Sequence, residues 1–218
     1  MRDDTVRRGR ELYCGLTDLA DNEIGKVLAA LHLHPEVAEN TMTIYSLDHG
    51  EKMGEQGLWW KNCMYEQSSR VSLITSWPKH FQGRRKIESL VELVDITPTL
   101  LEAAAIPVPA GVQGRSLMPL LTGQTTTHRD SVYMEYFDAN PPFQTPPMLT
   151  GVRTEKFKLS FYDKPITGEL YDLQNDPGEV TNLCDDPPHK DTSNMMLPIL
   201  AGRMIEATDP LPEGHSSW

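Results

Sequence analysis

The chain has 218 residues, with 20 basic and 31 acidic side chains and a formal net charge of −11. This length allows one good hydrophobic core or two small ones. The acidic balance argues against general nucleic-acid binding, which needs clustered lysine and arginine. Apolar runs stay below the roughly eighteen residues of a membrane span. Three widely spaced cysteines give no disulfide framework, and nothing in the sequence assigns a cellular compartment.

The first third of the chain predicts one helix and two strands. Apolar residues recur at three- and four-residue steps over residues 9–31, which indicates an amphipathic helix that must end before Pro35. The runs Thr41–Leu47 and Val71–Trp77 are apolar on both faces, as in the central strands of a covered sheet. We expect Cys14 and Cys63 to be plain buried thiols.

The middle of the chain predicts helices. Residues 87–105 are expected to form a helix in two pieces, with Thr97 as a cap, Pro98 at the first helical position, and capping-box spacing between Thr99 and Glu102. The stretch Ile106–Gly114 is predicted to be a loop, because it carries glycine and proline. A short helix over Ser116–Leu121 should follow and end at Gly123.

The last part of the chain predicts a small antiparallel sheet followed by a helix. The expected strands are Ser131–Tyr136, Met148–Arg153, Lys156–Tyr162 and Gly168–Leu173. A helix over Asn194–Ala207 should be interrupted by Pro198. The polar bridge over residues 122–130 is the best boundary. We therefore predict an α/β domain over residues 1–123 and a small α+β subdomain over residues 124–218.

The segment 41–61 carries the strongest functional signal. The predicted strand Thr41–Leu47 leads at once into Asp48-His49-Gly50, and α/β sheets place functional groups at the carboxyl ends of their strands. One carboxylate oxygen and one imidazole nitrogen suit a divalent metal ion. Lys61 follows as a mobile positive charge suited to sulfate or phosphate. The alternatives are a capping Asp48 with a surface His49, and a loop lysine lying along a tryptophan.

The sequence around this segment resembles the sulfatase family of the alkaline-phosphatase superfamily. The blocks that carry the resemblance are Asp48-His49-Gly50-Glu51, Gly54-Glu55-Gln56-Gly57, Leu58-Trp59-Trp60-Lys61, Val94-Asp95-Ile96-Thr97-Pro98-Thr99, Gly111-Val112-Gln113-Gly114-Arg115-Ser116 and Glu169-Leu170-Tyr171-Asp172-Leu173. They follow in order over most of the chain, so chance similarity is a poor explanation. The resemblance implies part of a sulfatase-type mixed sheet flanked by helices in residues 1–123, followed by an antiparallel four-stranded sheet with a helix.

The nucleophile motif of that family is absent from this sequence. Sulfatases oxidise the cysteine of a Cys-x-Pro-x-Arg motif to formylglycine, and Cys14, Cys63 and Cys184 all lack that context. The family's early Asp-Asp metal pair is missing as well, since Asp3-Asp4 does not follow an apolar strand. The chain thus resembles the carboxyl-terminal half of a sulfatase, and no catalytic nucleophile is assigned within it.

The resemblance implies that Asp48 and His49 bind the divalent cation and that Lys61 binds the sulfate of the substrate. Calcium is the usual ion of the family, but an imidazole nitrogen shifts the preference of the site toward manganese or zinc. Calcium and manganese want about six donors. Since this chain supplies two of the expected metal ligands, we predict that it is inactive alone.

The implied function is hydrolysis of sulfuric esters, with a small sulfate ester or a sulfated carbohydrate as substrate. One alternative is a phosphonate or phosphodiester hydrolase of the same superfamily, which also uses an Asp-His pair. Another is a non-catalytic remnant that acts as an interaction module. Half of a sheet would expose apolar strand edges, so self-association is a further expectation.

Overall fold

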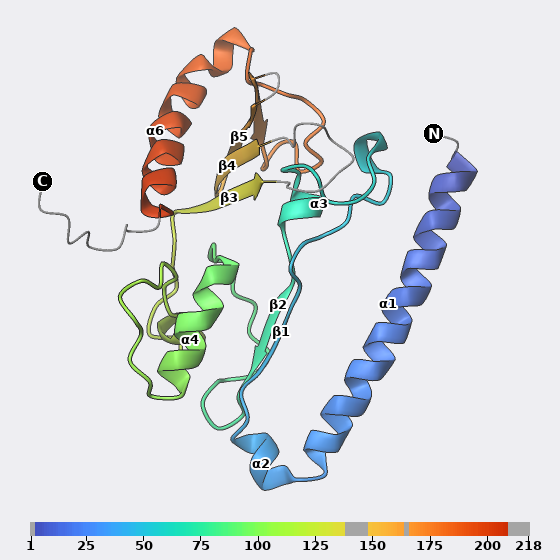
Figure 1. Cartoon of the computed structure of the whole chain (residues 1–218), viewed down its shortest axis with the longest axis vertical. Coiled ribbons are helices and arrows are strands. Elements are labelled where there is room, and N and C mark those ends of the chain that lie inside the picture. The colour runs from blue at the N-terminus through green and yellow to red at the C-terminus, as the bar shows by residue number, and fades with distance from the viewer. Residues whose placement is uncertain (1–2, 138–147, 164–165, 209–218) are drawn as a thin grey trace, which may run out of the picture. The chain divides into compact units, whose positions relative to one another are not determined.

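The computed structural model describes residues 3–137, 148–163 and 166–208, and it divides the chain into two compact units, Met1–Lys86 and Ile87–Trp218. The expected α/β class is confirmed, with one two-stranded and one four-stranded antiparallel sheet accompanied by helices (Figure 1). The predicted boundary at residues 123 and 124 falls inside the second unit, and the division into two domains stays a prediction. The expected turn at Asn140-Pro141-Pro142 lies outside the described residues.

The first unit begins with a long helix. Helix α1 spans Asp3–His32, six residues longer at its start than predicted, and Asp3 and Asp4 suit the positive end of its dipole. Pro35 does not merely follow it, because that residue opens the short helix α2, Pro35–Glu39. Cys14 lies exposed on α1, so the prediction that it is buried was wrong, whereas Cys63 is buried.

Strands β1, Thr43–Ser46, and β2, Leu73–Ser76, are shorter than predicted and pair antiparallel. Between them lie the short helices η1, Glu55–Gly57, and α3, Glu66–Ser69. The expectation of a covered central sheet is not met within the described residues, since Tyr45 and Ile74 are exposed. Two strands with open edges form only a marginal sheet in water.

The second unit is built around a four-stranded sheet in the order β3-β4-β5-β6. Its strands are β3 Ser131–Phe137, β4 Met148–Thr154, β5 Phe157–Asp163 and β6 Ile166–Asp172, all antiparallel to their neighbours. The register places Tyr133, Val152, Leu159 and Leu170 in one row. Because residues paired across strands share a face, this row forms the side that a helix can cover.

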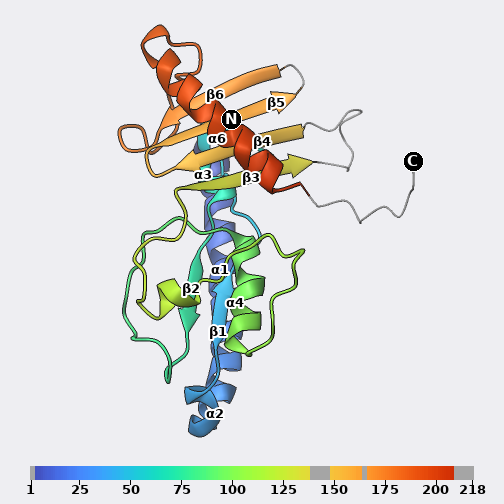
Figure 2. The same cartoon turned by 90° about the vertical axis from the view of Figure 1, so that its left-hand side faces the viewer.

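Helix α6, Lys190–Glu206, covers that face, as Figure 2 shows for this unit. Its residues Met196 and Leu200 join Val152, Leu159 and Leu170 in a core that is almost fully buried. The predicted interruption at Pro198 was wrong, because the helix continues through it. Proline removes one backbone hydrogen bond, and the burial of Met196 and Leu200 on either side holds the helix together.

The helices before the sheet differ from the prediction in their starting points. The 3-10 helix η2, Leu93–Asp95, leads directly into α4, Ile96–Ala103, and residues 87–92 are not helical. The capping box joins Glu92 and Asp95, so the predicted cap at Thr97 was wrong. The helix α5, Met118–Leu121, then follows the expected loop, and the 3-10 helix η3, Pro187–His189, precedes α6.

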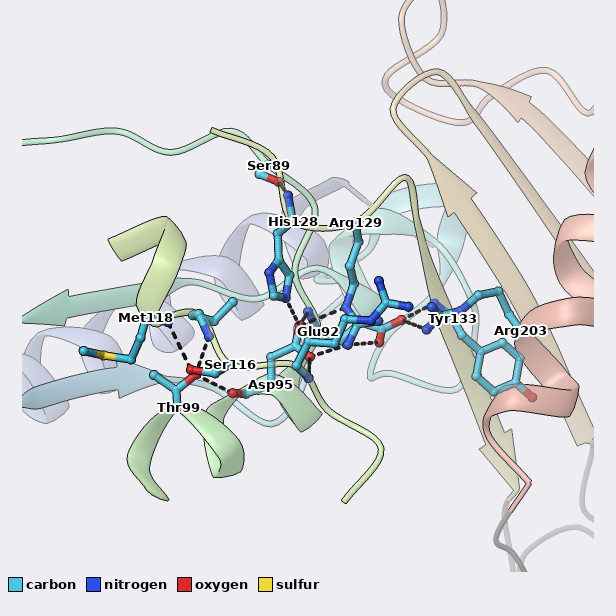
Figure 3. Close-up of polar contacts among 12 residues, drawn as sticks. Ser89, Glu92, Asp95, Thr99, Ser116, Met118, His128, Arg129, Tyr133 and Arg203 are labelled. Carbon is cyan, nitrogen blue, oxygen red and sulfur yellow. Dashed lines mark hydrogen bonds and ion pairs between the residues drawn. The ribbon is translucent and has the colours of Figure 1, made fainter. Parts of the chain in front are cut away.

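The carboxylate of Asp95 is the polar centre of the second unit (Figure 3). It is fully buried and accepts hydrogen bonds from the guanidinium of Arg129, from the backbone N–H of Arg115 at 2.8 Å and from that of Glu92 at 2.9 Å. The Nε2 atom of His128 lies 3.1 Å away. Burial pushes the pKa of Asp95 upward, but the hydrogen bonds from Arg129 and the two backbone N–H groups outweigh it and hold this pKa below its usual value of 3.8.

A second carboxylate links this centre to the sheet and to helix α6. The Oε1 atom of Glu92 accepts hydrogen bonds from the backbone N–H of Tyr133 at 2.7 Å and from Arg203 at 2.6 Å, and its Oε2 atom lies 3.2 Å from Arg129. Asp95 and Glu92 therefore tie η2, the segment before β3, and α6 into one unit. Among the described helices, none is both long and apolar enough to span a membrane.

We predict that Asp95→Asn lowers the free energy of unfolding of the second unit by about 3 kcal/mol, because it leaves Arg129 buried without its charged partner. Urea unfolding followed by circular dichroism measures the change. Asp130→Asn at an exposed neighbouring position is the control and should change stability by less than about 0.5 kcal/mol. Equal effects of the two substitutions would contradict the assigned role of Asp95.

The wild type and Asp95→Asn also test the direction of the pKa shift of Asp95, through the pH dependence of their stability. A folded pKa below the unfolded value means that ionised Asp95 stabilises the fold above about pH 4, and that this contribution is lost as the pH falls through the folded pKa. The stability difference between the wild type and Asp95→Asn should therefore shrink on acidification. A constant difference down to pH 2 would argue against it.

Candidate functional site

The predicted site residues lie on the connection that follows strand β1. Asp48 comes two residues after the end of the strand, and its side chain is exposed. Its Oδ1 atom accepts the backbone N–H of His49 at 3.0 Å. The Oδ2 atom lies 3.4 Å from Nε2 of His49, so the two side chains point toward each other.

Lys61 completes this group, although it is twelve residues away from His49 in the sequence. Its Nζ atom lies 2.6 Å from Nε2 of His49. An ammonium group can only donate, so Nε2 is the acceptor and the ring proton lies on Nδ1, which donates to the carbonyl of Gly50 at 2.8 Å. A backbone carbonyl that fixes the ring in this way is typical of metal-ligating histidines, and here the lone pair of Nε2 points toward Lys61.

A short ladder of backbone hydrogen bonds brings Lys61 back to His49. The N–H of Lys52 donates to the carbonyl of Trp60 at 3.0 Å, and the N–H of Gly54 donates to that of Leu58 at 2.8 Å. The chain therefore runs out from residue 52 and returns to residue 60. Residue 61 then lies beside the start of the connection, which explains how two separate motifs form one group.

The base of this loop is fixed by helix α3. The N–H of Gly50 donates to the carbonyl of Ser68 at 2.7 Å, and the hydroxyl of Ser68 donates to the carbonyl of Lys61 at 2.6 Å. A side chain at residue 50 would collide with the backbone, because a Cβ atom there would lie 1.9 Å from the carbonyl oxygen of Gln67. Glycine at this position is thus required by close approach.

Several loop residues have left-handed backbone conformations that glycine adopts more easily. Positive φ angles occur at the non-glycine residues Met53 (50°), Gln56 (47°) and Trp60 (70°), and at Gly54 and Gly57. Such angles cost free energy and persist only where neighbouring contacts hold them. Here Glu51 accepts the N–H of Trp60 at 2.6 Å, and Arg10 of helix α1 donates to the carbonyl of Met53 at 2.9 Å.

Two loop residues have roles that the sequence did not indicate. Lys52 is almost fully buried, where it donates to the amide oxygens of Gln56 and Gln67 and lies 4.1 Å from the ring centroid of Tyr65. Glu51 fixes the backbone at Trp60 by accepting its N–H. A lysine and a glutamate in a polar loop look like solvent-exposed residues, so only the folded contacts distinguish them.

The two tryptophans differ in their surroundings. Trp59 is partly buried against helix α1, and a Cβ atom at Gly9 would lie only 2.3 Å from its ring. Trp60 is 68% exposed, directly before Lys61. The described residues contain no group of three or more His, Cys, Asp or Glu side chains that could hold a metal ion. Among the described residues, Asp48 and His49 therefore have no third side chain of these types beside them with which to hold such an ion.

Comparison with known proteins assigns this chain to a family. Residues 54–204, more than two thirds of the chain, match the family model described as N-sulphoglucosamine sulphohydrolase, C-terminal. The chain belongs to this sulfatase family. The predicted resemblance to the carboxyl-terminal half of a sulfatase is therefore confirmed. The metal- and sulfate-binding roles of Asp48, His49 and Lys61 stay predictions.

Individual relatives match nearly all of this sulfatase chain but only part of their own length. This chain is 30% identical over 205 residues to N-acetylglucosamine-6-O-sulfatase of Bacteroides thetaiotaomicron. The match covers 92% of this chain and 36% of that protein. A solved structure of a protein in complex with its substrate D-glucosamine-2-N,6-O-disulfate has a TM-score of 0.80 and 29% identity, and covers 90% of this chain and 40% of that one.

A phosphonate monoester hydrolase from Silicibacter pomeroyi is also similar in structure. Its TM-score is 0.86 at 26% identity, with 95% of this chain and 43% of that chain covered. The sulfatase chain thus spans about two fifths of the proteins that it matches. The same fold therefore serves relatives named for sulfate esters and a relative named for phosphonate esters.

We predict that Glu51→Ala speeds amide hydrogen exchange at Trp60 about tenfold or more. The substitution removes a charge-assisted hydrogen bond that holds a left-handed residue, and such bonds contribute about 1.5–3 kcal/mol. Exchange measured by NMR on the 218-residue chain gives the rate. Glu36→Ala in helix α2 is the control, because Glu36 is exposed outside the loop. Unchanged exchange at Trp60 would show that the loop does not depend on Glu51.

Proposed function

We propose that this chain supplies the metal- and sulfate-binding part of a sulfuric-ester hydrolase. The observation that carries the proposal is the meeting of three side chains at one point, the carboxylate of Asp48, Nε2 of His49 and the ammonium group of Lys61. Membership of a sulfatase family supports the reaction class.

The donor set fits part of a divalent metal site. Asp48 offers an anionic oxygen and His49 a neutral nitrogen whose tautomer is fixed by the carbonyl of Gly50. This mixed set favours manganese more than an all-oxygen set would, while calcium is the ion usual in the family. A bound divalent ion acts as a Lewis acid that polarises the ester oxygens. Further ligands must come from residues beyond these two.

Lys61 is suited to the anionic part of the substrate. Its ammonium group is exposed and is placed by the returning loop, so it can approach an oxygen of a sulfate group next to the metal ligands. A positive charge there would stabilise negative charge that develops on the ester oxygens. Trp60, the neighbouring residue in the sequence, is exposed and so is available to contact the alcohol part of an ester. A sulfated carbohydrate is a suitable substrate class, and one protein of similar structure was solved in complex with such a substrate.

Hydrolysis of phosphonate or phosphate esters is the second candidate. Its support is the structural similarity to a phosphonate monoester hydrolase, together with the Asp48-His49 pair. Sulfate and phosphonate esters present similar tetrahedral anions, and Lys61 could bind either. The distinction depends on the nucleophile, which these residues do not include. Turnover of a phosphonate ester in preference to a sulfate ester by the completed enzyme would favour this candidate.

The proposed metal ligands can be tested by metal binding to the 218-residue chain. We expect manganese to bind with a dissociation constant on the order of 1 mM or weaker, because two protein ligands are few for this ion. Asp48→Asn and His49→Ala should each weaken binding about tenfold, as measured by electron paramagnetic resonance of free manganese. Asp21→Asn in helix α1 removes the same charge at an exposed position and is the control. Equal binding by Asp48→Asn and the control would refute the proposed ligands.

The activity of the 218-residue chain by itself can also be tested. The 218-residue chain alone should release no detectable product from p-nitrocatechol sulfate in the presence of calcium or manganese, because it lacks the Cys-x-Pro-x-Arg nucleophile motif. Product release is followed by absorbance over many hours, with a complete sulfatase as positive control. Metal-dependent turnover that disappears in Lys61→Met would show that the chain is an enzyme by itself.

A further inference from the structure

The turn that follows strand β2 gathers positive charge in an otherwise acidic chain. The sequence has no aspartate or glutamate between Gln67 and Ile87, although the whole chain has a net charge of −11. We call residues 77–86 the basic turn. Its exposed basic side chains are Lys79, His80, Arg84, Arg85 and Lys86. Clusters of this kind are typical of surfaces that bind extended polyanions.

Contacts at its start hold the basic turn in place. The N–H groups of His80 and Phe81 both donate to the carbonyl of Trp77 at 2.9 Å. The ring of Trp77 lies 3.7 Å from that of His80 between centroids, and it meets the ring of Phe81 edge-on at 5.9 Å. The N–H of Lys79 donates to the carbonyl of Glu39 at 3.1 Å, so the turn lies beside helix α2 (Figure 1). A turn fixed in this way loses little conformational entropy when a ligand binds.

The charge of the turn stays positive after its acidic neighbours are counted. Helix α2, which the turn contacts, carries the exposed carboxylates of Glu36 and Glu39. These two charges stand against four lysine and arginine side chains of the turn. Among the described residues, the side chains of Lys79 and Arg84 form no ion pair. Arginine matches tetrahedral oxyanions with two parallel hydrogen bonds, so the turn suits sulfate groups.

The basic turn and the candidate site lie at opposite ends of the ladder formed by β1 and β2. Ser76, directly before the turn, pairs with Thr43, whereas Ser46, two residues before Asp48, pairs with Leu73. Four paired residues span about 10 Å along a strand. One sugar ring therefore cannot touch both places, and the turn is a separate surface for anions.

We propose that the basic turn binds a sulfated polysaccharide and so retains a polymeric substrate on the enzyme. A retained chain raises the effective concentration of its other sulfate groups at the candidate site. The choice of ligand rests on the proposed function, whereas the charge of the turn does not. Single-stranded nucleic acid and membranes fit less well, because both use exposed aromatic rings, and Trp77 packs against His80 and Phe81 instead.

The test is binding of a fluorescein-labelled heparin decasaccharide to the 218-residue chain, followed by fluorescence anisotropy. We expect a dissociation constant of about 100 μM or tighter at about 0.1 M salt. Lys79→Gln combined with Arg84→Gln should weaken binding about tenfold and reduce its dependence on salt, because fewer counterions are released.

The matched control is Arg7→Gln combined with Arg8→Gln on helix α1, which removes the same charge at exposed positions. This control should change binding by less than about twofold, because salt screens charges that lie far from the ligand. Circular dichroism verifies that the variants stay folded. Lys79→Gln alone, expected to weaken binding about threefold, replaces the double variant if that one does not fold.

Several outcomes would overturn the proposal. Absence of heparin binding is one, and equal weakening by the two double variants is another. A third is equally tight binding of single-stranded DNA of the same length, or of phosphatidylserine vesicles, that depends on Lys79 and Arg84, since the turn would then recognise anions in general.

The variant Lys61→Met separates this proposal from the proposed function. It should leave heparin binding unchanged. Loss of binding in Lys61→Met but not in the Lys79 and Arg84 double variant would place the ligand in the candidate site, which supports the proposed function and overturns binding at the turn. Equal manganese binding by Asp48→Asn and its control, with heparin still bound at the turn, would overturn the proposed metal ligands alone.

Discussion

The candidate site depends on the return of one loop on itself. The two hydrogen bonds that join Lys52 to Trp60 and Gly54 to Leu58 are ordinary backbone bonds, but they decide where residue 61 lies. Without them the ammonium group of Lys61 would follow a flexible connection and would have no fixed relation to His49. The close approach at Gly50 fixes the other side of the same loop against helix α3. The arrangement of the candidate site therefore depends on the path of the backbone as much as on the side chains.

The loop holds costly backbone angles with buried or charged contacts. Met53, Gln56 and Trp60 occupy the left-handed region, where side chains other than glycine are disfavoured. Glu51, Lys52 and Arg10 hold these residues from three directions, through a backbone N–H, side-chain amides and a backbone carbonyl. Strain that is maintained by several contacts is characteristic of functional loops, because a rigid loop need not lose conformational entropy when a ligand binds.

The sequence predicted the elements well where a repeating apolar pattern determines the structure. The long amphipathic helix and the four antiparallel strands follow from periodicity alone. Prediction from the sequence failed where contacts with distant residues decide where a helix begins or whether it continues. Asp95 rather than Thr97 begins helix α4, because Asp95 is held by Arg129 and by a backbone N–H twenty residues away. Pro198 stays within α6, because packing of Met196 and Leu200 overrides the lost hydrogen bond.

In the candidate site too, some features were predictable from the sequence and others depend on contacts made only in the folded chain. The neighbourhood of Asp48, His49 and Lys61 was predicted from motifs, whereas the roles of Glu51, Lys52 and Arg10 required the folded loop, since nothing in a single sequence reveals a left-handed tryptophan or a buried lysine. Cys14 was predicted to be buried because free cysteine usually is. It lies exposed on helix α1, a helix in which no described residue is buried.

The two units differ in how complete they are. The second unit has a closed apolar core and buried ion pairs whose partners all lie within it, including Asp95 with Arg129 and Lys158 with Glu179. The first unit buries few apolar side chains, Cys63 and Met64 among them, and leaves apolar side chains of helix α1 such as Leu16 and Val27 exposed. It is also the unit that holds Asp48 and His49, which we propose as two metal ligands, whereas calcium or manganese wants about six donors. Both shortages occur in the same 86 residues.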